Sequence, residues 1–315
     1  SRREPVRRGL PANPGLRDTG FVGDAGRPRA LLGNSETLMF ARLALPLLLS
    51  LVAACSDGQV VENKATDGAP MRIVSLDLCA DQYVLKFVDR ERILAVSPVA
   101  TADFSYMRET AEGVPTVRPN AEDVLVLKPD LVVRAYGGGP NAKAFFERAG
   151  VPVLTVGWAS DIPAVMAMIE SVASDLGAPE YGARVVEHMR ARLARVSEAK
   201  DRVAALFMTP SGVTTGPGSL VHEMLMAAQV DNFQTQPGWQ PIPLERLAYD
   251  NPDLVAAAFF DSRTNHPDAW SPMRHPVARR QLRDRPTVPI KGAWTSCSGW
   301  YLLDAVEAVA EGARL

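Results

Sequence analysis

Histidines, cysteines and one glycine-rich turn are the residues of this 315-residue chain that first suggest chemistry. No two histidines have the spacing of a zinc-binding pair, and no G-x-S-x-G nucleophile elbow is present. The four histidines are His188, His222, His266 and His275. The sequence therefore predicts no metal site and no catalytic residues.

The glycine-rich turn, Gly137 to Ala142, fits the G-x-G-x-x-A pattern of dinucleotide-binding proteins. That pattern also requires an acidic residue about 20 positions further on, at the end of the next strand. The next predicted strand ends at Gly157 and Trp158, and Asp161 comes too late. We therefore interpret the glycines as a turn between a strand and a helix.

The three cysteines, Cys55, Cys79 and Cys297, are too few for a disulfide framework. No histidine lies near Cys79 in the sequence to activate it, so we expect Cys79 to be a half-buried structural thiol rather than a nucleophile. Cys79 and Cys297 both fall near the ends of predicted strands, one in each half of the chain. A disulfide between them is geometrically conceivable.

Aromatic residues in predicted loops are the better candidates for a functional site. They offer flat, rigid, apolar surfaces with polar edges, which suit a bulky planar ligand. The residues that we predict to bind such a ligand are Tyr106, Tyr136, Trp158, Trp239 and Trp294. The alternative is that each is an ordinary core aromatic. Arg118 and Arg263 are candidates for recognising an anionic ligand, or are solvated surface charges.

One sequence pattern occurs twice, 123 residues apart. Glu122 precedes Pro129-Asp130 by seven residues, and Glu245 precedes Pro252-Asp253 by the same number. Each copy predicts a short helix opened by glutamate, a Pro-Asp turn, and a strand buried on both faces. A unit repeated at this distance indicates two similar lobes rather than a short-period solenoid.

Strands alternate with helices through both copies, which predicts an α/β fold. We expect two lobes, 71–177 and 201–315, each with a mainly parallel sheet flanked by helices. Residues 178–200 should form one long connecting helix, because an apolar stripe of Tyr181, Val185, Met189, Leu193 and Val196 opposes a charged face. Ligands of such sheets sit beyond the carboxyl ends of the strands.

The first 70 residues differ in kind from the rest. Residues 1–38 are predicted to be disordered or upstream of the true start. Residues 39–54 have the short positive start and apolar core of a signal peptide, too short to span a bilayer. The signal ends in Leu-Val-Ala-Ala before Cys55, which resembles a bacterial lipobox, so we expect Cys55 to be acylated and 55–70 to be a polar tether. A plain secretory signal is the alternative.

Charge also separates these parts. Residues 1–54 carry a net charge of +4 and the remainder −6. A mildly acidic mature protein lacks the basic surface of a nucleic-acid binder. We therefore predict no nucleic-acid partner.

From Arg72-Ile-Val-Ser-Leu76 through both Pro-Asp copies, the chain resembles periplasmic solute-binding proteins of ABC importers for cobalamin and ferric siderophores. The resemblance implies an extracytoplasmic, lipid-anchored monomer without cofactor or enzymatic activity. It would deliver a ferric siderophore, haem or corrinoid to an ABC permease. In that family one exposed glutamate of each lobe docks onto the permease, and the matching positions are Glu122 and Glu245.

The second hypothesis is an exported metal-ion-binding protein or an enzyme on the same two-lobed fold. The sequence leaves open which ligand and which permease are involved, and whether residues 1–38 are made.

Overall fold

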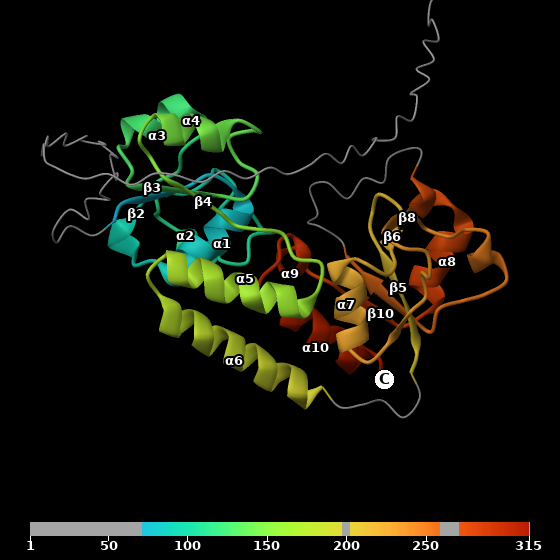
Figure 1. The fold of residues 1–315 in the computed structure, drawn as a ribbon. Coiled ribbons are helices and arrows are strands. Elements are labelled where there is room, and N and C mark those ends of the chain that lie inside the picture. The colour runs from blue at the N-terminus through green and yellow to red at the C-terminus, as the bar shows by residue number, and fades with distance from the viewer. Residues whose placement is uncertain (1–70, 197–201, 259–270, 315) are drawn as a thin grey trace, which may run out of the picture. The chain divides into compact units, whose positions relative to one another are not determined.

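The computed structural model describes residues 71–196, 202–258 and 271–314 (Figure 1). The predicted signal peptide, Cys55 and the tether lie outside the described residues, as do Arg263 and His266. No helix within the described ranges is long and apolar enough to cross a membrane.

The first lobe contains a four-stranded parallel sheet in the order β2-β1-β3-β4. Its strands are β1 (Ile73–Ser75), β2 (Ile93–Ala95), β3 (Leu131–Arg134) and β4 (Val153–Thr155). Its helices are α1 (Leu78–Phe87), η1 (Arg90–Arg92), α2 (Arg108–Ala111), α3 (Ala121–Val126), α4 (Ala142–Arg148) and α5 (Ile162–Asp175). Helix α6 (Pro179–Arg195) follows and runs beside α5 (Figure 1).

The second lobe repeats this arrangement in the order β10-β9-β5-β7, also parallel. Its strands are β5 (Ala204–Met208), β7 (Asp231–Asn232), β9 (Leu254–Ala257) and β10 (Thr287–Pro289). Its helices are α7 (Leu220–Ala227), η2 (Arg246–Ala248), η3 (Pro272–Arg274), α8 (Pro276–Asp284), α9 (Gly292–Thr295) and α10 (Leu302–Gly312). The predicted fold class is confirmed. If the four parallel strands of each lobe are numbered in chain order, both sheets have the spatial order second, first, third, fourth.

The two Pro-Asp aspartates have the same structural role. Asp130 accepts a hydrogen bond from the backbone N–H of Arg72 at 2.7 Å, and Asp253 accepts one from Ala204 at 2.8 Å. Each carboxylate thus joins the start of its own strand to the start of the central neighbouring strand. This hydrogen bond explains why aspartate follows proline in both copies, because a turn alone would not require an aspartate there.

Buried side chains of both lobes form one continuous hydrophobic cluster, in which Tyr83 and Val186 lie with Phe207 and Val306. Helix α6 buries Val185 and Met189, and the other members of its predicted stripe pack partly buried against the same cluster. Helix α6 ends at Arg195 within the described residues; the predicted end at residue 200 lies outside them.

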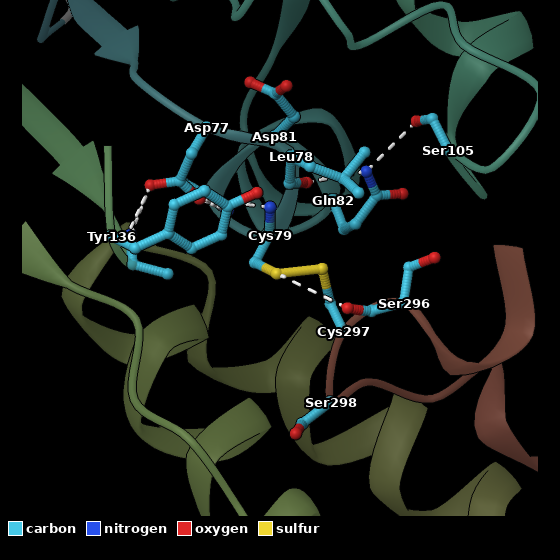
Figure 2. Close-up of a disulfide and its surroundings, with 12 residues drawn as sticks. Asp77, Leu78, Cys79, Asp81, Gln82, Ser105, Tyr136, Ser296, Cys297 and Ser298 are labelled. Atoms are coloured by element: carbon cyan, nitrogen blue, oxygen red, sulfur yellow. Dashed lines mark hydrogen bonds between the residues drawn. A yellow bond between two sulfur atoms is a disulfide. The ribbon is translucent and has the colours of Figure 1, made fainter. Parts of the chain in front are cut away.

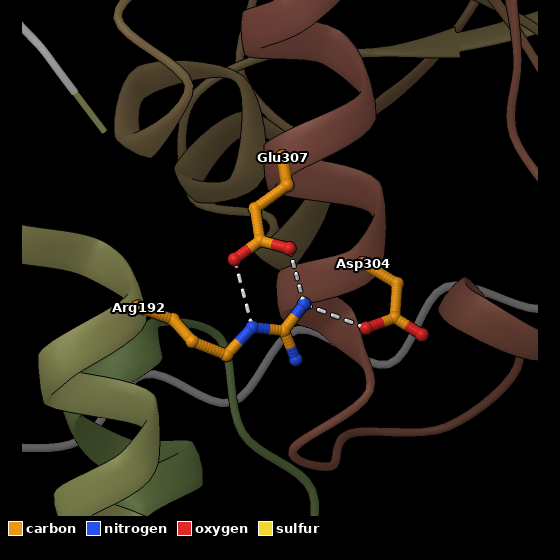
Figure 3. A network of polar contacts seen from close by, with 3 residues as sticks. All are labelled: Arg192, Asp304 and Glu307. Atoms are coloured by element: carbon orange, nitrogen blue, oxygen red, sulfur yellow. Dashed lines mark hydrogen bonds and ion pairs between the residues drawn. The ribbon is translucent and has the colours of Figure 1, made fainter. Parts of the chain in front are cut away.

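A charged network ties α6 to α10 (Figure 3). The Arg192 guanidinium donates to Glu307 through Nε at 2.8 Å and through Nη2 at 2.6 Å, and Nη2 also donates to Asp304 at 2.7 Å. Arg192 lowers the pKa of Glu307, because the guanidinium favours the ionised carboxylate. Because α6 also packs beside α5 of the first lobe, this network helps to join the two lobes in addition to the apolar packing.

Three details of the second lobe differ from the sequence prediction. Trp239, which was predicted to lie in a loop, begins β8 (Trp239–Pro241), and β8 pairs with β6 (Val213–Thr215) as an antiparallel ribbon that the sequence did not predict. The predicted helix opened by Glu245 is only the 3₁₀ turn η2. Glycine and proline around β6 obscured its Val-Thr-Thr run of β-branched residues, which favours a strand.

Candidate functional site

A cavity of about 950 Å³ is lined by residues of both lobes. Most of its lining comes from loops that follow the parallel strands or from the helices that begin there. The first lobe contributes Leu78, Thr101, Ala102, Asp103, Phe104, Trp158 and Ser160; the second contributes Phe207, Gly218, Ser219, Leu220, Val221, Gly238, Trp239, Thr295, Ser296, Cys297, Ser298 and Leu302. This is the edge at which open α/β sheets bind ligands.

Two of the five predicted aromatics line this cavity, one from each lobe. Trp158 follows β4 and is 74% exposed, and Trp239 begins β8 and is 59% exposed. Large exposed aromatics are unusual on a surface that has no partner. Together they offer two apolar contact surfaces for a bulky ligand.

The β6–β8 ribbon positions Trp239. The Gly238 carbonyl accepts hydrogen bonds from Gly216 N at 2.9 Å and from the Thr215 hydroxyl at 3.1 Å. A Cβ at Gly216 would collide with the carbonyl oxygen of Gln236, so the backbones can approach this closely only at a glycine. The Phe207 ring lies edge-on to Trp239 with ring centres 6.4 Å apart.

The other three predicted aromatics are not among the residues that line the cavity. Tyr106 stacks on Tyr301 with ring centres 4.7 Å apart, and burial, followed by the Asp304 carboxylate, raises the pKa of Tyr106 to about 12. Trp294 lies partly buried in α9, with the Lys291 ammonium 5.1 Å from its ring centre. Their contact with a ligand remains a prediction.

Tyr136 lies next to a buried carboxylate that organises the first lobe (Figure 2). Asp77 caps α1 by accepting the N–H groups of Cys79 and Ala80, each at 3.1 Å. Its other oxygen accepts the N–H groups of Ala135, Tyr136 and Gly137 at 2.7, 2.9 and 2.7 Å. One carboxylate therefore holds both the start of α1 and the loop after β3.

A second buried carboxylate, Asp81, lies one turn further along α1. It accepts hydrogen bonds from the backbone N–H and the hydroxyl of Ser97. Burial raises the pKa of Asp81 to about 6, although these hydrogen bonds act in the opposite direction. The folded first lobe therefore keeps a proton on Asp81 to a higher pH than an exposed aspartate would.

Cys79 and Cys297 form a disulfide with a Cα–Cα distance of 5.4 Å (Figure 2). The expectation of a free structural thiol at Cys79 was therefore wrong, and the conceivable disulfide is present. Cys79 lies in the first turn of α1, and Cys297 follows α9. The bond joins the two lobes at the cavity, because Cys297 itself lines it.

Asp103 is the only charged side chain among the described residues that line the cavity, and none of them is a lysine, arginine, histidine, tyrosine or methionine. The described part of the chain holds no group of three or more His, Cys, Asp or Glu side chains that could bind a metal ion. Arg118, a candidate for anion recognition, instead pairs with Asp123 at 2.7 Å and is 77% exposed. The described lining suits an apolar ligand better than an anionic one.

The two glutamates predicted to dock onto a permease are both exposed. Glu122 lies in the first turn of α3, whose N-cap Asn120 accepts the N–H of Asp123 at 2.8 Å. Glu245 immediately precedes η2. The surface carboxylates are thus present in both lobes, on different local structures.

Sequence reasoning missed Phe104, Phe207 and Leu220 as lining residues. Phe104 belongs to the same loop as Tyr106, and both rings pack against the hydrophobic cluster, but only Phe104 also lines the cavity. Phe207 lies near the carboxyl end of β5 and Leu220 at the start of α7. Their predicted positions at the carboxyl ends of the strands, where such sheets bind ligands, could have identified them.

Residues 73–265 match the family described as Periplasmic binding protein. The chain is 24% identical over 302 residues to the uncharacterized ABC transporter substrate-binding lipoprotein YvrC of Bacillus subtilis, covering 85% of this chain and 94% of that protein. It is also 24% identical to the Cobalamin-binding protein of Halobacterium salinarum, over 60% of this chain and 54% of that one.

Solved structures share the fold. A periplasmic heme-binding protein from Roseiflexus sp. RS-1 superposes with a TM-score of 0.61 at 21% identity, covering 78% of this chain and 100% of that chain. The vitamin B12 binding protein of Vibrio cholerae superposes with a TM-score of 0.57 at 18% identity, covering 78% and 97%. Both likenesses concern the arrangement of the two lobes.

Proposed function

The chain belongs to the periplasmic binding protein family, a family of binding proteins rather than enzymes, and on this premise we propose that it is the substrate-binding protein of an ABC importer. In this proposal it carries a bulky chelate between its lobes and presents it to a permease. The observation that carries the proposal is the cavity of about 950 Å³, to which Trp158 and Trp239 contribute from different lobes. The names of the Bacillus subtilis and Halobacterium salinarum relatives support it.

The described lining favours some chelates over others. Haem and catecholate siderophores carry negative charges, and haem iron in proteins is commonly held by a histidine, tyrosine, methionine or cysteine thiolate. No histidine, tyrosine or methionine lines the described cavity, and Cys297 is disulfide-bonded. The one charged group of the described lining is the carboxylate of Asp103. We therefore favour a ligand whose metal is already fully coordinated and whose net charge is not negative, such as a corrinoid or an uncharged ferric siderophore.

The test is equilibrium binding of cyanocobalamin, haemin, and uncharged and anionic ferric siderophores to the purified protein. Trp158→Ala and Trp239→Ala should each weaken the preferred ligand about tenfold or more, as removal of a central aromatic contact does. Tyr249→Ala is the matched control, because Tyr249 is an exposed aromatic outside the cavity lining. Unchanged affinity in both tryptophan variants would place the ligand elsewhere.

Docking is proposed to use Glu122 and Glu245. Two exposed carboxylates on different lobes can orient the protein on a two-fold permease and steer its encounter. Glu122→Arg combined with Glu245→Arg should abolish ligand uptake in cells and leave affinity for the ligand unchanged. Glu109→Arg is the control, since this glutamate of the first lobe is 86% exposed. A loss of affinity in the double variant would argue against a docking role.

Anchoring is proposed to use Cys55, whose preceding Leu-Val-Ala-Ala resembles a lipobox. The protein would then work on the outer face of a membrane, held by lipid alone. Incorporation of labelled fatty acid into the native chain, but not into Cys55→Ser, would support this; labelling of both would refute it.

A further inference from the structure

The Cys79–Cys297 disulfide joins residues 218 positions apart and connects the two lobes beside the ligand cavity. Both cysteines are almost fully buried, at 4% and 3% exposure, yet Cys297 contributes to the cavity surface. Leu78, the neighbour of Cys79, lines the cavity as well. The bond therefore lies within the cavity wall.

The segment 295–298, here called the cavity floor, supplies four consecutive lining residues. Apart from the disulfide and a 4.0 Å contact of the Cys79 Sγ with the Ser296 carbonyl, its described ties to the first lobe are hydrogen bonds of Ser298. The Tyr83 hydroxyl donates to the Ser298 carbonyl at 2.8 Å, and the Ser298 hydroxyl donates to the Ala159 carbonyl at 3.4 Å. The second of these is long for a hydrogen bond between oxygens.

The other end of the disulfide is rigid. Cys79 lies in the first turn of α1, where Asp77 accepts the N–H of Cys79 itself and three N–H groups of the loop after β3. The floor has fewer described hydrogen bonds: Cys297 follows the four-residue helix α9, and Ser296 donates to the Gly292 carbonyl through its hydroxyl at 2.6 Å and its N–H at 2.9 Å. The covalent bond thus fixes an irregular segment to a firm one.

We propose that the Cys79–Cys297 disulfide positions the cavity floor and couples ligand affinity to the redox state of this cysteine pair. This inference rests on the proposed binding function. A dithiol reductant would supply two electrons and two protons: the S–S bond breaks, two thiols form, and the dithiol becomes a disulfide. The lobes would remain joined by the Arg192 network and by the packing of Trp300 on Tyr83, whose ring centres are 5.8 Å apart. Reduction therefore loosens the floor and not the whole molecule.

Two consequences follow for the ligand. The reductant reaches Cys297 through the empty cavity, so an occupying ligand slows reduction. Linkage also requires the two equilibria to be reciprocal: the factor by which reduction weakens ligand binding equals the factor by which bound ligand disfavours reduction. A purely structural disulfide, with no energetic coupling to ligand binding, would show neither effect. An extracytoplasmic location is one in which disulfides form and persist.

The first arm of the test needs no ligand. Amide hydrogen exchange is measured on the full-length native protein and on the Cys79→Ser/Cys297→Ser variant. Exchange in 292–301 should rise about tenfold or more in the variant, with little change in β5 and β9. Tyr83→Phe is the matched control, since it removes a non-covalent tie between the same two elements and leaves the disulfide in place. Unchanged exchange in the serine variant would overturn the positioning role.

The second arm uses cyanocobalamin as the probe. We expect cyanocobalamin to bind the serine variant about tenfold more weakly than the native protein. In dithiothreitol redox buffers, bound cyanocobalamin should shift the thiol–disulfide equilibrium of Cys79 and Cys297 toward the disulfide by the same factor. Differential alkylation and mass spectrometry of the two cysteine peptides give that equilibrium. Equal binding to both proteins would overturn the coupling. No binding to either protein, with faster exchange in the variant, would exclude a corrinoid as the ligand and leave the positioning role standing.

Discussion

The two lobes share a sheet and diverge where their first strands end. In the first lobe, β1 leads directly to Asp77, which caps α1 and also holds the loop after β3. In the second lobe Phe207 is the counterpart of Ser75, because Ser75 pairs with Val133 and Phe207 pairs with Ala256, 123 residues later. The position that matches Asp77 is therefore Thr209. Thr209 instead closes a turn with Val213 at the start of β6, and α7 begins only after its own cap, Ser219.

This divergence decides what each lobe brings to the cavity. A direct strand-to-helix connection places Leu78 and the disulfide at the cavity wall in the first lobe. The intervening ribbon of the second lobe carries Trp239. Shared strands thus provide a common frame, while the first connection after the sheet determines the chemistry of each half.

The largest expected effect concerns the two matched positions. Asp77→Ala removes a buried carboxylate that accepts five backbone N–H groups, and should lower the free energy of unfolding by about 4 kcal/mol. Thr209→Val removes one hydroxyl and should cost about 1 kcal/mol. Urea denaturation of both variants measures the difference. Equal losses would mean that Asp77 does not organise its lobe as described.

A smaller effect depends on pH and concerns a carboxylate of α1. Burial raises the pKa of Asp81 from 3.8 to about 6. Between these values the folded state holds a proton that the unfolded state has released, so stability falls as pH rises through this window. Ionisation above pH 6 should cost about 3 kcal/mol, which Asp81→Asn avoids.

The measurement is the free energy of unfolding of the wild type and Asp81→Asn at pH 7.5 and pH 4. On acidification the wild type should gain about 2 kcal/mol relative to the variant. Glu223 holds the same place in α7, four residues after the cap, but is only partly buried, so Glu223→Gln is the matched control from the second lobe. Parallel profiles for the wild type and Asp81→Asn would show that Asp81 titrates normally.

The smallest expected effect concerns a feature that the two lobes share, the aspartate of each Pro-Asp unit. Asp130→Ala and Asp253→Ala each remove one hydrogen bond from a partly solvated aspartate to a backbone N–H, so each should cost about 1 kcal/mol. Chemical denaturation of the two single variants gives both values. A loss in one variant more than twice that in the other would show that the Pro-Asp units are not equivalent.

Much of the frame could be predicted from the sequence. The apolar runs at Leu131 and Leu254 appear as β3 and β9, and the predicted apolar stripe of the connecting helix packs against the hydrophobic cluster from Tyr181 to Leu193 of α6. Proline and aspartate mark the element boundaries because their effects on the backbone are local. The β6–β8 ribbon was missed because its pairing partners, Thr215 and Trp239, lie 24 residues apart and each run is only three residues long.

The site was only partly predictable. Trp158 and Trp239 were found because both stand at a strand end or in a loop where the chain leaves them exposed. Tyr106 and Phe104 lie two residues apart in one loop and both pack against the hydrophobic cluster, and nothing local determines which ring also lines the cavity. That choice depends on Tyr301, nearly 200 residues further along the chain.

By itself the sequence determined the alternation of strands and helices, the repeated Pro-Asp unit and the exposed glutamates before it, because each depends on residues close to one another along the chain. Only the tertiary structure decided that Cys79 bonds to Cys297, that Arg192 joins two carboxylates of α10, and which aromatics face the cavity. Those contacts join distant segments, and they exist only once the helices of both lobes pack into one core.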